Sequence, residues 1–509
     1  MKQTVLVLDF GGQYKELIAR MVRSLNVFAE IMPGDTSIDS IREIDPIGII
    51  LTGGPKSVYE PTSLKCDPEL FALGIPILGI CYGMQLMCYM LGGEVGKGPA
   101  GEYGQVEAVI TAKSPMFNGF GKPPCKSMVL MSHGDSVLKI PQGFTQIAKT
   151  VNCIAAIENN EKKLYGLQFH PEAVLSLEGE RVFKNFLFDI CGGQESYKLK
   201  DYINEQIEII KKTIGDKKVL LGLSGGLDSS VTAALLAKAV PEQLYSIFVD
   251  HGLMRHDEGD EIEAAFRDHD MHFIRVNAQD RFLDRLKGVI DPERKRKIIG
   301  EEFIRVFEEE AKKLGKIPFL AQGTIYPDIV ESGGAYGATI KSHHNVGGLP
   351  ENLDFERIIE PLSMLFKNEV RELGRRLKLP LDMLNRQPFP GPGLAVRVVG
   401  EITKDKLDVL RRADYIFRQE IEKNEPRPKQ YFAVLTDSLS VGVKGDARTY
   451  DPVVALRAVI TDDFMTAKAA RVPYEVLEAA ATRITNEIPS VSRVVYDITS
   501  KPPATVEWL

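Results

Sequence analysis

Residues 219–230 read VLLGLSGGLDSS, and this stretch decides the fold of the middle of the chain. Val219–Leu223 is a short apolar run that predicts a buried strand, and Val231–Val240 has apolar residues at helical spacing. Between them, Gly225 and Gly226 permit a sharp turn of the backbone. Because the free N–H groups at a helix start attract anions, the stretch predicts a strand, a phosphate-binding loop and a helix.

A glycine-rich turn between a strand and a helix is common in α/β proteins and need not bind anything. Here three serines and an aspartate surround the glycines, which favours phosphate binding. The loop has no lysine, so it is not the P-loop that ends in Gly-Lys-Ser/Thr. It resembles the SGGxDS pyrophosphatase loop (PP-loop) of enzymes that cleave ATP between the α and β phosphates, with Leu227 where valine is usual. The resemblance implies an adenine nucleotide alpha hydrolase-like α/β domain that binds ATP through Ser224, Gly225, Gly226, Leu227, Asp228, Ser229 and Ser230.

The length of 509 residues exceeds what one hydrophobic core serves, so two to four domains are expected. Changes of pattern predict domains at 1–195, 196–385 and 386–509. The formal net charge of -7 argues against a nucleic-acid partner. No apolar run of about 18 residues and no signal peptide are seen, so we expect a cytoplasmic protein without a membrane partner.

The first segment, to about residue 195, has apolar runs at Val5–Asp9, Gly48–Thr52 and Ile77–Ile80, separated by helical patterns. This alternation predicts a parallel sheet with helices on its faces, whose functional groups collect at the carboxyl ends of the strands. Cys81 follows the third run and precedes a helical pattern, a position that exposes a nucleophile and favours its thiolate.

A histidine and a carboxylate two residues apart, His170 and Glu172, could serve Cys81 as base and orienting acid. The segment resembles the class I glutamine amidotransferases over residues 3–190, which implies a flavodoxin-like domain with Cys81 as nucleophile. The resemblance also implies an oxyanion hole formed by the N–H groups of Gly54 and Tyr82. It further implies a glutamine pocket lined by Gln85 and residues 132–135.

All six cysteines lie in the first 191 residues, and none belongs to a Cys-x-x-Cys pair. Zinc binding and a disulfide framework are therefore not favoured. The five cysteines other than Cys81 have no histidine or carboxylate neighbour of this kind in the sequence, and we expect them to be structural: Cys66, Cys88, Cys125, Cys153 and Cys191.

The middle segment continues with strand patterns at Leu244–Asp250 and Phe273–Val276. Asp328 and Glu331 are three residues apart, so on a helical turn they would face the same way. Such carboxylates beside an ATP site suit Mg²⁺, but a solvated acidic face explains the spacing equally well. Lys341 lies in a glycine-rich stretch, and we expect it in a lid that closes over phosphates.

The last segment begins with Arg386–Leu394, RQPFPGPGL, whose prolines and glycines predict a non-helical domain boundary. Beyond it, strand patterns such as Phe432–Leu435 alternate with helical ones such as Lys404–Lys423, which predicts a small α+β domain. Chain ends are normally frayed. Residues 496–509, however, hold two prolines and the only tryptophan, which favours an ordered and functional tail.

The order of these parts resembles the fused bacterial form of the glutamine-hydrolysing GMP synthetases, from Asp9 to Trp508. The resemblance implies that Mg-ATP adenylylates XMP and that ammonia formed at Cys81 then displaces AMP. It also implies a homodimer formed by the C-terminal dimerisation domain. The further site residues that it implies are Val249, Gly323 and Lys341 for ATP, Arg255, Asp446, Lys501, Thr505 and Glu507 for XMP, and Asp328 and Glu331 for the metal ion.

Other kinds of protein share parts of this pattern. tRNA-thiolating enzymes share the SGGxDS loop but generally need cysteines near it and a basic surface, and no cysteine follows Cys191. NAD synthetases and asparagine synthetases share the ATP chemistry with different glutaminase halves. A glutamine-sensing binding protein without activity is the non-enzyme alternative, against which the intact Cys81, His170 and Glu172 argue.

Overall fold

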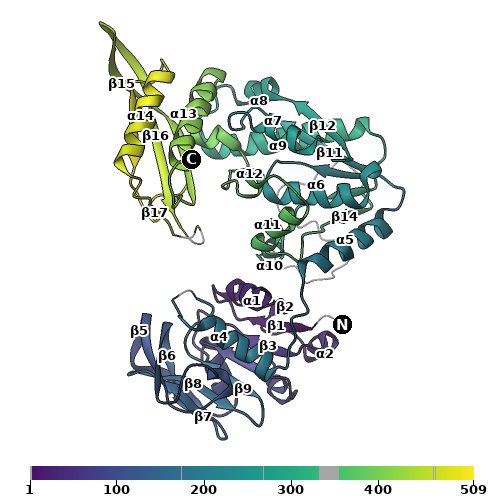
Figure 1. Ribbon diagram of the computed structural model, residues 1–509, viewed down its shortest axis with the longest axis vertical. Helices are drawn as coiled ribbons and strands as arrows, with labels where there is room; N and C mark the ends of the chain where they lie inside the picture. Colours follow the sequence, from purple (N-terminus) through teal and green to yellow (C-terminus); the bar gives the residue numbers. More distant parts are fainter. Residues whose placement is uncertain (1–2, 174, 268, 332–354, 462–463, 465) are drawn as a thin grey trace. The chain divides into compact units, whose positions relative to one another are not determined.

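The computed structural model describes residues 3–509 apart from 174, 268, 332–354, 462, 463 and 465. It divides into two compact units, one reaching Asp201 and one beginning at Tyr202. The first unit is built on one large sheet and the second on two smaller ones (Figure 1). Among the described residues, no helix is long and apolar enough to cross a membrane. The domain boundaries near residues 195 and 385 stay predictions.

The sheet of the first unit is parallel in one half and antiparallel in the other. Its order is β2 (Phe28–Pro33), β1 (Thr4–Asp9), β3 (Gly48–Leu51), β4 (Ile77–Ile80), β9 (Leu164–Leu167), β8 (Ile154–Asn159), β7 (Thr145–Lys149), β5 (Glu94–Ile110) and β6 (Cys125–Lys139). The strands from β2 to β9 run parallel in a flavodoxin-like order, as predicted. The sequence did not predict the antiparallel half, because β5 is rich in glycine and largely exposed and so lacks an apolar run.

Helices pack on both faces of the parallel half of this sheet. They are α1 (Lys15–Ser24), α2 (Ile38–Ile44), α3 (Tyr82–Met90) and α4 (Gly179–Lys184). Leu6, Leu8 and Leu51 form one buried cluster with Met84 of α3. The intervening Val7 is also fully buried, so β1 is covered on both faces, as in a parallel sheet between two helical layers.

The second unit contains a parallel five-stranded sheet. Its order is β12 (His272–Asn277), β11 (Leu244–Asp250), β10 (Val219–Gly222), β13 (Phe319–Ala321) and β14 (Arg357–Ile359). Strand β10 comes first in the chain but lies between β11 and β13, so the strand order reverses there. Open α/β sheets bind ligands at such a reversal, beyond the carboxyl ends of the strands.

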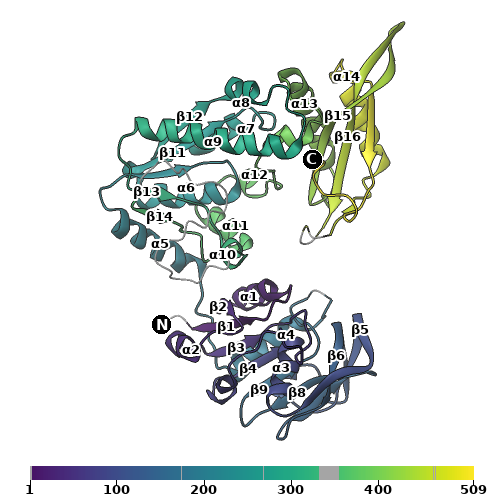
Figure 2. The same cartoon turned by 180° about the vertical axis from the view of Figure 1, so that it is seen from behind.

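Helices surround this sheet (Figure 2). They are α5 (Leu199–Ile214), α6 (Leu227–Ala239), α7 (Glu258–Phe266), α8 (Gln279–Leu286), α9 (Pro292–Lys313), α10 (Tyr326–Glu331), α11 (Lys367–Arg376) and α12 (Leu381–Leu384). The longest of them, α9, begins where the Asp291 side chain accepts a hydrogen bond from the Arg294 N–H and Pro292 occupies the first turn. Both features favour a helix start.

The C-terminal segment is α+β, as predicted. It comprises α13 (Lys404–Glu422), β15 (Gln430–Lys444), β16 (Ala447–Ile460), β17 (Lys468–Ala469), α14 (Tyr474–Glu487) and β18 (Arg493–Asp497). One buried cluster joins Phe307 of α9 to Leu394 and Phe417. The prediction of a non-helical stretch at 386–394 is confirmed up to Pro392, but a short 3-10 helix, η5 (Gly393–Arg397), begins at its end. The Leu394 N–H donates to the Leu253 carbonyl oxygen at 2.7 Å, which packs this end against the middle segment.

Candidate active sites

Cys81 lies at the sharp turn between β4 and α3, with φ 52° and ψ −105°, and is 7% exposed. A positive φ is uncommon for a residue other than glycine and marks a strained turn that presents the side chain. The Cys81 N–H donates to the Leu167 carbonyl oxygen at 2.7 Å, which ties the turn to the end of β9. The local structure is thus the predicted nucleophile elbow.

His170 and Glu172 follow β9, and both are buried. Nδ1 of His170 donates to Oε1 of Glu172 at 2.7 Å. Burial alone lowers the pKa of His170, but the charge of Glu172 and a hydrogen bond with Cys81 outweigh burial and raise this pKa to about 10. A cationic imidazole at this place can stabilise the negative charge that a sulfur nucleophile carries during attack.

Glycines 53 and 54 allow the backbone to approach this pair closely. A Cβ on Gly53 would lie 3.3 Å from Cε1 of His170, and one on Gly54 would lie 2.9 Å from the Phe10 carbonyl oxygen. Tyr82 is the first residue of α3, so its N–H has no acceptor within the helix. Such an N–H suits an oxyanion hole, and the roles of Gly54 and Tyr82 there stay predictions.

Gln85 and the strand segment 132–135 do lie around the nucleophile. Nε2 of Gln85 donates to the Asp135 carbonyl oxygen at 2.8 Å and to Oε1 of Gln168 at 3.2 Å. The Gln168 amide nitrogen in turn lies 3.6 Å from the Cys81 sulfur. The Ser132 carbonyl oxygen lies 3.8 Å from the same sulfur.

The expectation that Cys153 has no histidine or carboxylate neighbour is wrong. Strand pairing places Glu102 of β5 opposite His133 of β6, and Cys153 lies against both side chains. No local pattern could reveal this, because the three residues come from distant parts of the sequence. Burial raises the pKa of the thiols of Cys66, Cys88 and Cys191 to about 12, consistent with inert structural cysteines.

The loop after β10 is held in shape by its own serines. Gly225 has φ +76°, and a Cβ there would lie 2.2 Å from Cδ1 of Ile262. The hydroxyls of Ser224 and Ser229 lie 2.9 Å apart, and the Gly226 N–H donates to the Ser224 hydroxyl at 3.3 Å. The loop leads into the start of α6, the arrangement that binds phosphates.

Asp228 of this loop is paired with a residue that the sequence did not single out. Oδ2 of Asp228 accepts a hydrogen bond from Nζ of Lys367 at 2.5 Å, while its Oδ1 is buried with no partner among the described residues. Lys367 begins α11, far from the loop in sequence and without a motif around it. The pair places one positive and one negative group beside the loop.

Other predicted ATP residues lie at the carboxyl ends of neighbouring strands. A Cβ on Gly323, just after β13, would lie 3.0 Å from the Ser229 nitrogen, and Val249 is buried near the end of β11. Asp328 and Glu331 both lie on α10, and Oδ2 of Asp328 accepts from the Ile325 N–H at 2.9 Å. Lys341 and the Glu331 side chain lie outside the part of the chain that the structure describes.

Three family profiles match this chain. They are "Glutamine amidotransferase class-I" over residues 6–190, "NAD synthase" over residues 197–287 and "GMP synthase C terminal domain" over residues 419–508. The first includes the elbow of Cys81, and the second includes the loop after β10.

Curated proteins match over nearly the whole chain. GMP synthase [glutamine-hydrolyzing] of Acetivibrio thermocellus is 59% identical over 510 residues, covering 99% of both chains. The proteins of the same name from Finegoldia magna and Treponema denticola are each 57% identical over 509 residues, which cover 99% of this chain and 99% and 97% of theirs. The chain belongs to the glutamine-hydrolysing GMP synthase family. It is therefore an enzyme of the ligase class.

Arg255, which the GMP synthase resemblance assigns to XMP, is 4% exposed and lies just beyond β11. Its guanidinium lies 4.2 Å from the centre of the Phe389 ring, and Nη2 donates to the Pro388 carbonyl oxygen at 3.3 Å. Nε and Nη1 have no hydrogen-bond partner among the described residues. Burial lowers the pKa of Arg255 to about 10, so the group is still cationic at neutral pH and two of its nitrogens face no acceptor.

The C-terminal tail of the chain is anchored by residues that were predicted to bind XMP. Glu507 forms a two-pronged ion pair with the fully buried Arg397, at 2.7 and 2.9 Å. Lys501 donates to the Phe464 carbonyl oxygen at 2.6 Å, and the Thr505 hydroxyl donates to the Glu507 carbonyl oxygen. These side chains have partners within the chain before any ligand binds.

Asp446 does not lie with the other predicted XMP residues of the same chain. It is exposed at the tip of the β15–β16 hairpin, whereas the tail contacts Gln430 at the other end of β15. The two ends of this strand are separated by roughly 40 Å at the usual rise per residue. A single site containing Asp446 and Glu507 of one chain is therefore excluded.

Proposed function

We propose that this chain makes GMP from XMP with two separate sites, a glutaminase at Cys81 and an ATP site at the loop Ser224–Ser230. XMP, ATP and glutamine are the substrates, and the glutaminase supplies ammonia to an adenylylated XMP. The observation that supports this best is the strained elbow of Cys81 beside the hydrogen-bonded pair of His170 and Glu172. That arrangement suits acyl transfer and little else.

In the glutaminase half, the Cys81 sulfur attacks the carboxamide carbon of glutamine. His170 takes the thiol proton and returns it to the departing ammonia, while Glu172 keeps the ring oriented and stabilises its positive charge. The N–H groups of Gly54 and Tyr82 stabilise the oxyanion, and Gln85 helps to shape the pocket. Water then hydrolyses the thioester to glutamate.

In the ATP half, the N–H groups and hydroxyls of residues 224–230 hold the phosphates at the start of α6. Lys367 adds a positive charge next to Asp228, and Val249 and Gly323 border the nucleotide. Lys341 completes the site from the segment outside the described residues. The result is the activation of the XMP oxygen as an adenylate, with release of pyrophosphate.

Mg²⁺ is the metal ion that we propose for this half. The buried Oδ1 of Asp228, for which the described part of the chain offers no partner, fits a cation, and Asp328 has a second carboxylate oxygen beyond the one that caps α10. Glu331 is the other proposed ligand. When bound, Mg²⁺ offsets the charge of the triphosphate.

For XMP, we propose binding by Arg255, Lys501, Thr505 and Glu507, with Asp446 contributed by a second subunit. The outer part of the β15–β16 hairpin, here called the arm, supports a homodimer. Its apolar side chains Leu439, Val443 and Tyr450 are 67%, 76% and 67% exposed, and a second subunit could cover them. Asp446 at the tip of the arm could then reach a partner's site, which the geometry of one chain forbids. We also propose that the enzyme is cytoplasmic.

The deciding experiment is to incubate the protein with XMP, ATP, Mg²⁺ and glutamine and to measure GMP, AMP, pyrophosphate and glutamate. The proposal requires all four products in equal amounts. Glutamate without GMP would show that the ATP half acts on another substrate, and the formation of neither would contradict both halves.

A further inference from the structure

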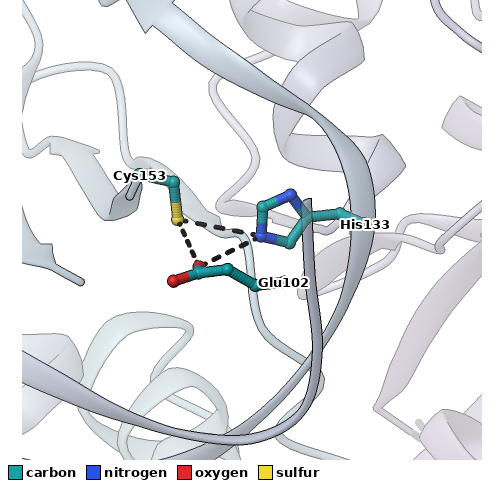
Figure 3. Close-up of side chains that lie close together, drawn as sticks. All are labelled: Glu102, His133 and Cys153. Carbon is teal, nitrogen blue, oxygen red and sulfur yellow. Dashed lines mark hydrogen bonds and ion pairs between the residues drawn. The ribbon is translucent and has the colours of Figure 1, made fainter. Parts of the chain in front are cut away.

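A second cysteine, histidine and glutamate cluster lies in the first unit, apart from the triad (Figure 3). Glu102 is on β5, His133 is on β6, and Cys153 is in the turn between β7 and β8. The three ligand atoms converge: Glu102 Oε2 lies 3.1 Å from Cys153 Sγ and 3.3 Å from His133 Nε2, and the latter two atoms lie 3.8 Å apart.

The hydrogen bonds of His133 direct its Nε2 towards the carboxylate of Glu102. Nδ1 of His133 lies 2.9 Å from the Asp135 carbonyl oxygen, which can only accept, so Nδ1 carries a proton. The other ring nitrogen, Nε2, lies 3.3 Å from Oε2 of Glu102. A proton between these two atoms joins them in the metal-free protein, and a bound metal ion would take the place of that proton.

The carboxylate of Glu102 is held by several donors. Its Oε2 accepts hydrogen bonds from the Thr150 hydroxyl and the Cys153 thiol, each at 3.1 Å, and its Oε1 accepts one from the Asn152 amide at 3.2 Å. The side chains of Glu102 and His133 are only 4% and 1% exposed. The carboxylate and the imidazole therefore form a buried polar pair, and a metal ion bound between them would be shielded from water.

The spacing of the three atoms matches a tetrahedral metal ion. Zinc bonds of about 2.0–2.3 Å to N, O and S ligands place the ligand atoms roughly 3.4–3.6 Å apart. The three distances in the cluster bracket this range. The Thr150 hydroxyl lies beside the cluster, 3.1 Å from Glu102 Oε2 and 3.4 Å from Cys153 Sγ, and a water molecule would be the fourth ligand.

We propose that Glu102, His133 and Cys153 form a binding site for Zn²⁺ or a similar transition-metal ion. The Cys153 thiol loses its proton to solvent as the metal–sulfur bond forms. Thiolate, carboxylate and neutral imidazole then carry two negative charges that balance the ion, so the buried site becomes neutral. The metal would join β5, β6 and the β7–β8 turn beside the segment that touches Cys81.

Cobalt binding tests this site in the full-length protein, because a thiolate ligand gives Co²⁺ an intense near-ultraviolet charge-transfer band. The Cys81→Ala variant is used as background, since the catalytic thiol and histidine could bind metal themselves. We expect one equivalent of Co²⁺ with this band, displaced by Zn²⁺. The band should persist when Cys125→Ser is added and disappear with Cys153→Ser, whose fold is checked by circular dichroism.

Absence of the band in the Cys81→Ala protein, or its persistence after Cys153→Ser, would overturn the proposal. Glu102→Gln provides a second variant that keeps the shape of the side chain. It should weaken Co²⁺ binding at least tenfold, because a carboxylate ligand is lost. Unchanged affinity in this variant would show that the three residues do not act together on the metal.

Discussion

Lys367 Nζ lies 2.5 Å from Asp228 Oδ2, although 139 residues separate the two in sequence. This contact connects the start of α11 to the PP-loop and gives the loop a positive charge that its own sequence lacks. In many nucleotide sites a lysine within the loop supplies that charge. Here the fold supplies it from another helix.

Lys367→Gln should therefore lower ATP-dependent GMP formation by about 10²-fold, with glutamine or with ammonia, because a cation beside the phosphates is lost. The rate of glutamine hydrolysis should not change, because the active site for that reaction stays intact. Steady-state assays with both nitrogen donors measure this. Arg375→Gln, on the exposed side of the same helix, is the control and should change little. Equal activity of the two variants would show that Lys367 does not act in the ATP site.

Cys81→Ala should abolish glutamine-dependent GMP formation and leave ammonia-dependent formation unchanged. The reason is that Cys81 and the PP-loop belong to separate compact units with separate chemistry. Cys125→Ser serves as a matched control and should retain both activities. Failure of added ammonia to restore activity to Cys81→Ala would contradict the division of labour.

Glu172→Gln should reduce glutamine hydrolysis roughly 10²- to 10⁴-fold, as loss of the orienting carboxylate does in related triads. It should also move the alkaline limit of activity to lower pH. The charge of Glu172 helps to raise the pKa of His170 from 6.5 to about 10, and without this charge the imidazole ring loses its proton at a lower pH. A pH–rate profile of glutaminase activity measures the shift, with Glu178→Gln as an exposed control.

The same shift has a consequence for stability. A pKa that is higher in the folded than in the unfolded state stabilises the fold fully below the unfolded value and loses this contribution as the pH rises through the folded one. For His170 the window runs from 6.5 to about 10. Between these limits, the wild type should lose more stability with rising pH than the Glu172→Gln variant, as chemical denaturation of the first unit would show.

The sequence predicted much of the fold because the signals are local. The strand, loop and helix at 219–239 and the turn at Cys81 follow from neighbouring residues, and the structure contains both. Lys367, the Glu102, His133 and Cys153 cluster and the antiparallel strand β5 were missed, because each depends on contacts between distant segments. Asp446 was assigned by resemblance alone, and one chain cannot bring it to the tail.

Glu507→Gln should destabilise the second unit by roughly 2 kcal/mol, because the fully buried Arg397 loses its two-pronged partner and keeps only Asp414, at 3.8 Å, as a charged neighbour. The tail should loosen as well, which raises the KM for XMP more than the KM for ATP. Urea unfolding and substrate titrations measure the two effects. Glu425→Gln removes an exposed ion pair with Arg427 and should change neither. An unaltered unfolding midpoint for Glu507→Gln would show that the pair does not hold the tail.

Mixing two inactive variants tests whether Asp446 acts in the site of a second subunit. Asp446→Ala and Arg255→Ala should each lack activity as separate proteins. After subunit exchange, half of the dimers are mixed, and each mixed dimer has one site with both an intact Arg255 and an intact arm. The mixture should therefore recover about a quarter of the wild-type activity. No recovery, although exchange is verified by mass spectrometry, would mean that Asp446 and Arg255 do not meet across a dimer.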